Sequence, residues 1–206
     1  MYLPAHFRVD DFDQIAALIE EHSFATLVTF DGAAPFATHL PLLFDRTRGP
    51  FGTLAGHVAL GNAQWKHLQS AQTGGGEVLA LFQGPHAYVS PSWYETELAV
   101  PTWNYVAAHA YGTPRLLTDD ELAAQLRAMI LKFESGFAAP WPGDLPDDFE
   151  SKLRLGIVGF EIEITRLEGK WKLSQNRPAA DQSGVIAALQ TSPRESDRRE
   201  IGRAHV

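Results

Sequence analysis

Polar side chains beside a strand-breaking proline mark the first segment of this chain that could bind a ligand. The segment is Thr38-His39-Leu40-Pro41, and it interrupts a run rich in β-branched and aromatic residues. Proline removes a backbone donor from the strand ladder, so it indicates an edge or a bulge. Backbone groups freed from strand pairing can then hydrogen-bond the polar rim of a heterocycle. A plain edge strand without a ligand explains Pro41 equally well.

A second segment passes from a strand into a helix and carries His57, Asn62 and Lys66. The start of a helix offers backbone donors to a phosphate group, and the lysine adds a positive charge. The competing interpretation is an ordinary helix cap at Asn62 with a solvated lysine. His39 and His57 have the titration range for proton transfer, but no residue stands out as an obligatory acid or base.

Aromatic residues gather in the run from Phe82 to Tyr94 and in the segment Val100 to Tyr105 that follows it. Rigid planar side chains between Gly and Pro residues are typical of a surface that binds a flat molecule with polar edges. Near the C-terminal end, Trp171–Arg177 combines one aromatic ring, two cations and two amides. That cluster can hold a phosphate or the edge of a planar ring, or it can be a latch in which Trp171 fills a gap in the core.

Several function classes are excluded or left without support. The 206 residues contain no cysteine, which excludes disulfides, thiolate zinc sites, iron–sulfur clusters and a cysteine nucleophile. The sequence has no Rossmann, P-loop, nucleophile-elbow or zincin motif. The eight histidines include no pair at the spacing that places two metal ligands on one helical face, so we expect no metal site.

Charge and hydropathy limit the partners. The net charge of −8 argues against a broad DNA-binding face, because sequence-independent affinity for DNA comes from Lys and Arg. No apolar run approaches the length of a membrane span, and the first residues lack the features of a signal peptide. We therefore expect an intracellular, cytoplasmic protein that does not enter a membrane.

The hydrophobic periodicity predicts a mainly β protein with peripheral helices. Helices are expected over residues 10–22, from Asn62 onward with Trp65 and Leu68 facing inward, after a capping box at Thr118–Glu121, and briefly over 149–153. Strands are expected over 24–30, 35–44, 51–57, 77–83, 103–117 and 157–167, with a hairpin at Asp31-Gly32 and a turn at Glu168-Gly169. Many short strands joined by hairpins favour an antiparallel barrel. We expect one domain over residues 1–190 and a flexible tail over 191–206.

These segments, in this order, resemble the PaiB family of FMN-binding negative transcriptional regulators. The resemblance runs from about Met1 to Leu189. It rests on the segments 4–7, 22–27, 37–42, 56–65, 82–93, 100–105 and 171–177. It implies an antiparallel split β-barrel of the FMN-binding, pyridoxamine-phosphate-oxidase-like type, with FMN as cofactor and a homodimer whose flavin sites form where two barrels meet.

The same resemblance assigns roles to the candidate residues. The strand at 38–41 would line the flavin ring, and the step from His57 to Lys66 would approach the phosphate. Trp103, Asn104 and the stretch Lys172–Asn176 would close the pocket, some of them from the partner subunit. The cofactor-binding residues expected from this are Thr38, His39, Leu40, Pro41, His57, Asn62, Lys66, Trp103, Asn104, Lys172, Ser174, Gln175 and Asn176.

Three functions are consistent with the sequence. The first is an FMN-binding protein in which the flavin is a redox or conformational cofactor, which includes an FMN-dependent oxidoreductase. The second is a negative transcriptional regulator that acts through DNA or a protein partner; DNA binding follows from the family label only, since no segment resembles a helix-turn-helix. The third is a haem-binding or haem-degrading barrel, although no histidine has a distinctive axial-ligand context.

Overall fold

The computed structural model describes residues 1–194 and 197–198. The rest of the tail predicted over 191–206 lies outside the described residues. Contacts between Cα atoms divide the chain into two compact units. The ribbon unit comprises Met1–His22, Phe82–His109 and Glu168–Val206, and the barrel unit comprises Ser23–Leu81 and Ala110–Leu167. Because three long strands run through both units, the division leaves the expected single domain over residues 1–190 a prediction.

One antiparallel sheet supplies the framework of the chain. Its strand order is β3-β2-β6-β7-β8-β5-β4, with the short β1 on β8. The strands are β1 Arg8–Val9, β2 Phe24–Phe30, β3 Pro35–Pro41, β4 Leu43–Asp45, β5 Thr53–Ala59, β6 Val78–Val89, β7 Thr102–Leu116 and β8 Ile157–Lys172. The helices are η1 Ala5–Phe7, α1 Phe12–Glu21, α2 Gln64–Gly74, η2 Pro91–Trp93, α3 Asp119–Glu134, α4 Asp147–Arg154 and α5 Ala179–Gln190.

The barrel unit curls because the two ends of the strand order are neighbours in sequence. β3 and β4 stand at opposite ends of that order, yet only Leu42 separates them along the chain. The backbone N–H of Leu42 donates to the carbonyl of Ser23 (2.8 Å), and its side chain is fully buried. A sheet whose first and last strands are joined by one residue must close on itself and leave a gap between them. The predicted antiparallel barrel is confirmed.

The core of the barrel unit follows the alternation of its strands. Leu27, Leu54, Phe160 and Ile162 are fully buried and face inward from three strands. Gly56 sits among them because a Cβ there would lie 2.6 Å from the Leu42 side chain. The hairpin predicted at Asp31-Gly32 joins β2 to β3, with Phe24 opposite Pro41 and Phe30 opposite Pro35. The strand expected over 35–44 breaks at Leu42 into β3 and β4.

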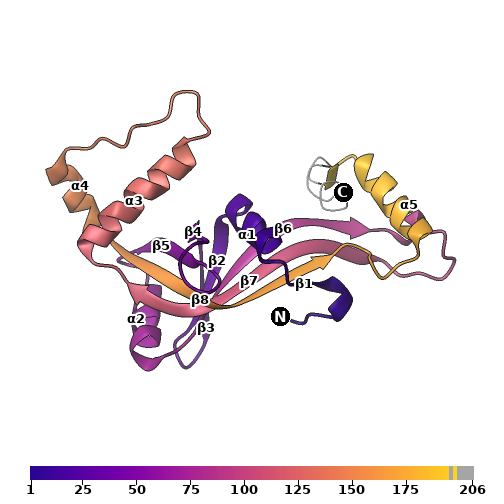
Figure 1. Ribbon diagram of the computed structural model, residues 1–206, viewed down its shortest axis with the longest axis horizontal. Helices are drawn as coiled ribbons and strands as arrows, with labels where there is room; N and C mark the ends of the chain where they lie inside the picture. The colour runs from indigo at the N-terminus through magenta and orange to yellow at the C-terminus, as the bar shows by residue number, and fades with distance from the viewer. Residues whose placement is uncertain (195–196, 199–206) are drawn as a thin grey trace. The chain divides into compact units, whose positions relative to one another are not determined.

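Helices of the barrel unit are fixed by specific caps and ion pairs. The capping box predicted at Thr118 and Glu121 is formed in both directions at the start of α3. Arg154 of α4 pairs with Asp119 of α3 (3.1 Å) and with Glu150 (2.8 Å), and Figure 1 shows α3 and α4 together. At α2 the cap is Ala63 rather than Asn62, and Gln64 rather than Trp65 accompanies Leu68 into the interior.

The ribbon unit contains the remaining parts of β6, β7 and β8 with α1 and α5. Gly84 allows close packing, since a Cβ there would lie 2.6 Å from Leu18 of α1. β8 continues straight through Glu168 and Gly169, so the turn predicted there is wrong. A Cβ on Gly169 would lie 2.7 Å from Ile15, which indicates that this glycine permits helix packing rather than a turn. Within residues 1–194, no helix has the length and apolar character needed to cross a membrane.

Candidate functional site

The predicted site residues fall into two sets, one in each unit. Thr38, His39, Leu40, Pro41, His57, Asn62 and Lys66 belong to the barrel unit, and Trp103, Asn104, Lys172, Ser174, Gln175 and Asn176 to the ribbon unit. Within each set the structure joins several residues by direct hydrogen bonds. The two sets are therefore described separately.

In the barrel unit, one amide fastens the start of α2 to β3. Asn62 Nδ2 donates to Thr38 Oγ1 (2.9 Å), and Asn62 Oδ1 accepts from the backbone N–H of Gln64 (3.0 Å). Gln64 in turn donates to the carbonyl of Leu27 (2.9 Å). Since Asn62 uses both ends of its amide inside the protein, its role in this structure is to position β3 against α2.

The strand β3 presents an open edge at this point. It pairs with β2 on one side and ends the strand order on the other, so its outer row of backbone groups has no partner strand among residues 1–194. Its His39 is exposed, and the Nδ1 atom lies 2.9 Å from Thr26 Oγ1 on β2. Leu40 turns its side chain into the core, so only its backbone can meet a ligand. Pro41 is half-buried at the end of the strand.

Lys66 is an exposed cation on the first turn of α2. Its ammonium lies 5.7 Å from the centre of the Trp65 ring, and Trp65 Nε1 donates to the carbonyl of Leu60 (3.0 Å). In the part of the chain that the structure describes, Lys66 has no carboxylate within ion-pair distance. The lysine can therefore meet an anion without breaking an internal ion pair.

His57 stands apart from these residues. It lines an apolar cavity of about 540 Å³ with α3, α4 and the segment between them; the lining includes Met129, Phe133, Trp141, Leu153 and Ile157. Its Nδ1 atom is buried and has no hydrogen-bond partner among the described residues. Burial lowers the pKa of His57, which favours the neutral imidazole. None of the other predicted residues lines this cavity.

In the ribbon unit, Lys172 has the most distinctive surroundings. Its Nζ donates to Thr102 Oγ1 (2.6 Å) and to the carbonyl of Trp103 (2.5 Å). Burial, together with the charges of Lys170 and Arg177, lowers the pKa of Lys172. Three cations thus lie close together, and no carboxylate pairs with them within the described residues. Such a cluster attracts an anion or an electron-rich edge.

Aromatic rings surround this cluster, which the sequence pattern around Trp171–Arg177 indicated only in part. The Lys170 ammonium lies 5.4 Å from the ring of Tyr2 and 5.1 Å from that of Tyr105, and the Arg177 guanidinium lies 4.6 Å from the ring of Tyr94. Lys170 was missed as a candidate. The signal that could have found it is its two-residue spacing from Lys172, which places both on the same face of a strand.

The neighbouring predicted residues mostly build the turn after β8. Ser174 has φ 68° and donates its hydroxyl to Asn104 Oδ1 (3.1 Å), and both side chains are buried. Gln175 accepts from the backbone of Leu173 (2.7 Å) and donates to the carbonyl of Trp171 (2.6 Å). Asn176 is exposed. These contacts shape the turn that follows Lys172 at the end of β8.

Trp103 is half-exposed and belongs to an aromatic group on the outer face of β6 and β7. Its ring centre lies 5.9 Å from that of Tyr88 and 6.4 Å from that of His86. This is the face on which the sequence places Trp103 and Tyr105, while Asn104 and Val106 point into the interior. An exposed aromatic surface next to a cation cluster suits a flat, electron-rich ligand.

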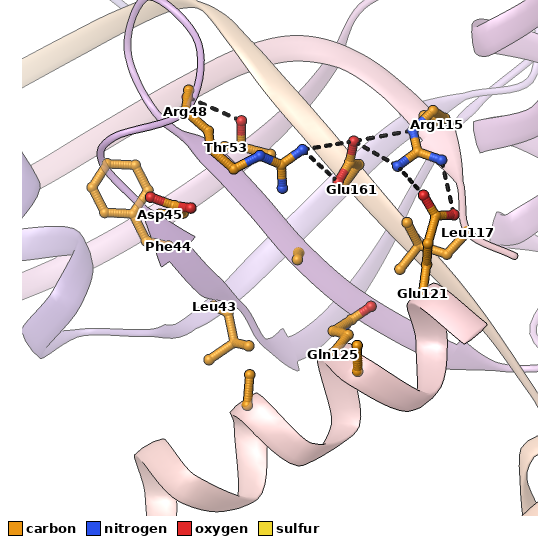
Figure 2. Close-up of a pocket in the computed structure, with 13 residues that line it drawn as sticks. Leu43, Phe44, Asp45, Arg48, Thr53, Arg115, Leu117, Glu121, Gln125 and Glu161 are labelled. Atoms are coloured by element: carbon orange, nitrogen blue, oxygen red, sulfur yellow. Dashed lines mark hydrogen bonds and ion pairs between the residues drawn. The ribbon is translucent and has the colours of Figure 1, made fainter. Parts of the chain in front are cut away.

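A second cavity, of about 490 Å³, contains none of the predicted residues. It lies between β4, β5 and α3, and Figure 2 shows the residues that line it. Glu161 of β8 accepts from Arg48 (3.1 Å) and Arg115 (3.0 Å), and Arg115 also pairs with Glu121 (2.9 Å). No motif in the sequence predicts this network, because its members come from four separate segments and meet only in the fold.

Comparisons with known proteins agree with the fold and the resemblance. A family model described as "Putative FMN-binding domain" matches residues 1–166. The chain is 43% identical to the protease synthase and sporulation protein PAI 2 of Bacillus subtilis over 192 residues, which cover 92% of this chain and 89% of that protein. This agreement confirms the resemblance to the PaiB family.

Solved structures of low sequence identity share the fold. The flavocytochrome Anf3 of Azotobacter vinelandii aligns with a TM-score of 0.61 at 14% identity and covers 80% of this chain and 69% of its own. The FAD and heme binding protein of Mycobacterium smegmatis aligns with a TM-score of 0.60 at 16% identity and covers 80% and 73%. The predicted antiparallel split barrel is thereby confirmed.

Proposed function

This chain belongs to the PaiB family of FMN-binding domains, with FMN as the cofactor, and from that premise we propose that its flavin lies against the open edge of β3. The unpaired backbone groups of Thr38–Pro41 are suited to hydrogen-bond the polar rim of the isoalloxazine ring. Asn62 and Thr26 support the proposal because they hold Thr38 and His39 in place without any ligand. The flavin, when bound, supplies redox chemistry.

The phosphate of FMN is assigned to the start of α2. Lys66 offers there an ammonium that has no carboxylate partner among the described residues, at the positive end of the helix dipole. Asn62 acts as a positioning residue, since both ends of its amide are occupied. His57 is not assigned to the phosphate, because it lines the separate cavity beside α3 and α4.

The ribbon unit supplies a second flavin-binding surface in this proposal. The cluster around Lys172 and the exposed ring of Trp103 fit the electron-rich edge and the face of an isoalloxazine ring. Asn104, Ser174 and Gln175 maintain the turn that follows Lys172, and Asn176 is exposed beside it. We propose that this surface serves the flavin of a second copy in a homodimer, and that the protein works in the cytoplasm.

The observation that carries the proposal is the open edge of β3, held in register by Asn62 beside an unpaired Lys66. A paired titration of FMN and riboflavin tests it, because riboflavin lacks the phosphate. Lys66→Met is expected to weaken FMN about tenfold and to leave riboflavin unchanged. Lys152→Met, on exposed α4, is the matched control. The assignment of the phosphate is wrong if Lys66→Met and Lys152→Met bind FMN equally.

Haem binding is a second candidate, because His57 is a neutral imidazole on the wall of a large apolar cavity. Such an imidazole can act as an axial ligand to iron. Titration with haem is expected to give a Soret band that the His57→Ala variant loses. A His57→Ala variant that keeps the Soret band, or an unaltered spectrum in the wild type, contradicts this candidate.

Transcriptional regulation through DNA or a protein partner stays a prediction that the family label suggests. The net charge of −8 does not favour direct contact with DNA. A mobility-shift titration with promoter DNA and random DNA at several salt concentrations tests it. Equal binding of both DNAs would exclude direct, sequence-specific repression.

A further inference from the structure

The cavity of about 490 Å³ between β4, β5 and α3 contains a hydrogen-bond acceptor without a donor. Gln125 of α3 lines this cavity together with Arg48, from the turn between β4 and β5, and Glu161 of β8 (Figure 2). The residue is 7% exposed, and its Oε1 atom has no partner among the described residues. Its Nε2 atom lies 3.9 Å from Met129 Sδ. Leaving a buried carbonyl unpaired costs free energy, so this atom indicates a donor that the described part of the chain does not supply.

The charges around the cavity do not balance. Asp45, Glu121 and Glu161 face two guanidinium groups, those of Arg48 and Arg115. Hydrogen bonds from Arg115 and Thr118 lower the pKa of Glu121 to about 2, and hydrogen bonds from Thr47 lower the pKa of Asp45. Glu121 and Asp45 are therefore ionised at neutral pH. One negative charge remains in excess.

Arg115 is already neutralised by two carboxylates. Its Nη1 and Nη2 atoms donate to both oxygens of Glu121 (3.0 and 2.9 Å), and its Nε atom donates to Glu161 (3.0 Å). Arg48 also donates to Glu161 from Nη2 (3.1 Å). Because carboxylates already neutralise both guanidinium groups and one carboxylate is in excess, the net charge of the lining repels an anion and attracts a cation.

Apart from the charged residues, Gln125 and Thr53, the residues that line the cavity are apolar, and those of α3 are small. Leu43 and Phe44 come from β4, Leu117 precedes α3, and Ala124 and Ala128 lie on α3 beside Gln125. Small side chains on the helix leave room for a flat body between helix and sheet. A cavity of this size is in the range that holds small organic ligands.

We propose that this cavity binds a small organic cation with a flat apolar body and an N–H head group that donates to Gln125 Oε1. The positive charge offsets the excess carboxylate, and the body packs on Phe44 and the alanines of α3. The site is separate from the flavin residues proposed above and does not rest on them. FMN itself, which carries a phosphate dianion, is unsuited to this cavity.

Three probes of one shape and different charge test the inference: benzamidine, benzamide and benzoate. The full chain is titrated with each by calorimetry and by NMR shifts, with and without FMN. Benzamidine is expected to bind saturably at one site, benzamide about tenfold more weakly, and benzoate not measurably. Equal affinity for all three, or no saturable binding of benzamidine, would overturn the proposal. If FMN does not bind in the same samples, that result contradicts the proposed flavin site and leaves the proposal for this cavity unaffected.

The Gln125→Leu variant separates a ligand acceptor from a structural residue. It is expected to weaken benzamidine at least about tenfold and, without the probe, to unfold at the same or a higher temperature, because an unpaired buried carbonyl is removed. Gln69→Leu, on exposed α2, is the control and should change neither quantity. A less stable Gln125→Leu variant, or unchanged benzamidine affinity, contradicts the proposal. The Ala124→Leu variant retains Gln125 but fills the cavity, and it is also expected to lose benzamidine binding.

Discussion

The two units differ in whether their cationic side chains form ion pairs with carboxylates. In the barrel unit Arg115 and Arg154 are each held by two carboxylates, while in the ribbon unit Lys170, Lys172 and Arg177 lie together with aromatic rings and without a carboxylate partner among the described residues. Paired charges fasten helices to the barrel. The mutual repulsion of unpaired cations lowers the stability of the fold. A ligand that offsets their charge removes this repulsion.

The ribbon unit depends instead on close backbone approach. A Cβ on Gly184 of α5 would overlap the carbonyl oxygen of Trp93 in η2. Asp181, one turn earlier, is buried and accepts from the backbone N–H groups of Glu95 (2.9 Å) and Thr96 (3.1 Å). These contacts fix α5 to the loop after β6 without an ion pair.

The largest effect is expected from Gly184→Ala, which separates these two ways of holding a helix. The added methyl must push α5 away from η2, and we expect a loss of about 3 kcal/mol in the free energy of unfolding. Urea denaturation measures it, and hydrogen exchange should increase over Ala179–Gln190. Gly136→Ala, where a Cβ has open space, is the control. Equal stability of the two variants would show that α5 is not held by this approach.

Glu161→Gln tests the paired charges of the barrel unit. It leaves Arg48 and Arg115 without their shared carboxylate, so we expect a loss of about 2 kcal/mol in unfolding free energy and unchanged FMN affinity. Urea denaturation and an FMN titration measure the two quantities. Glu163→Gln, an exposed position on the same strand, is the control. A stability equal to that of the control would mean that the ion pairs contribute nothing.

Lys172→Met tests the unpaired cations of the ribbon unit. Because Lys172 is assigned to the ring edge, the affinity for FMN and for riboflavin should fall equally, by about tenfold. Removal of the repulsion from Lys170 and Arg177 offsets the lost hydrogen bonds to Thr102 and Trp103, so we expect the unfolding temperature to change little. Fluorescence titrations and thermal melts measure both. If affinity is lost for FMN but not for riboflavin, the phosphate must be assigned to Lys172 instead of Lys66.

The smallest effect is expected from Asp181→Asn. Burial alone would raise the pKa of Asp181, but hydrogen bonds from Thr96 and Glu95 outweigh it and lower the pKa below 3.8. The stability gained from the ionised form is therefore complete above pH 3.8 and is lost as the pH falls through the lower folded value. At pH 7 the variant should melt about 3 °C below the wild type. That difference should shrink in acid, and a constant difference would argue against the ionised carboxylate.

Local patterns in the sequence predicted most elements of the fold. The Asp-Gly hairpin, the capping box at Thr118 and the strand expected over 103–117 depend on neighbours within a few residues, and all are confirmed. The turn at Glu168-Gly169 is wrong because glycine serves turns and close packing alike, and only the presence of Ile15 opposite Gly169 distinguishes them. The residues assigned to FMN stay a prediction.

The sequence by itself determined the family, the cofactor and the antiparallel barrel, since these follow from ordered motifs and from hydrophobic periods that each segment carries alone. Only the tertiary structure decided which groups are already occupied and which are free. Asn62 and Ser174 look like ligand donors in the sequence but hydrogen-bond within the protein, whereas Gln125 looks like an ordinary helix residue and is left with an unpaired carbonyl. Whether a buried polar group has a hydrogen-bond partner depends on residues that are far apart in the chain, so no local sequence pattern can predict it.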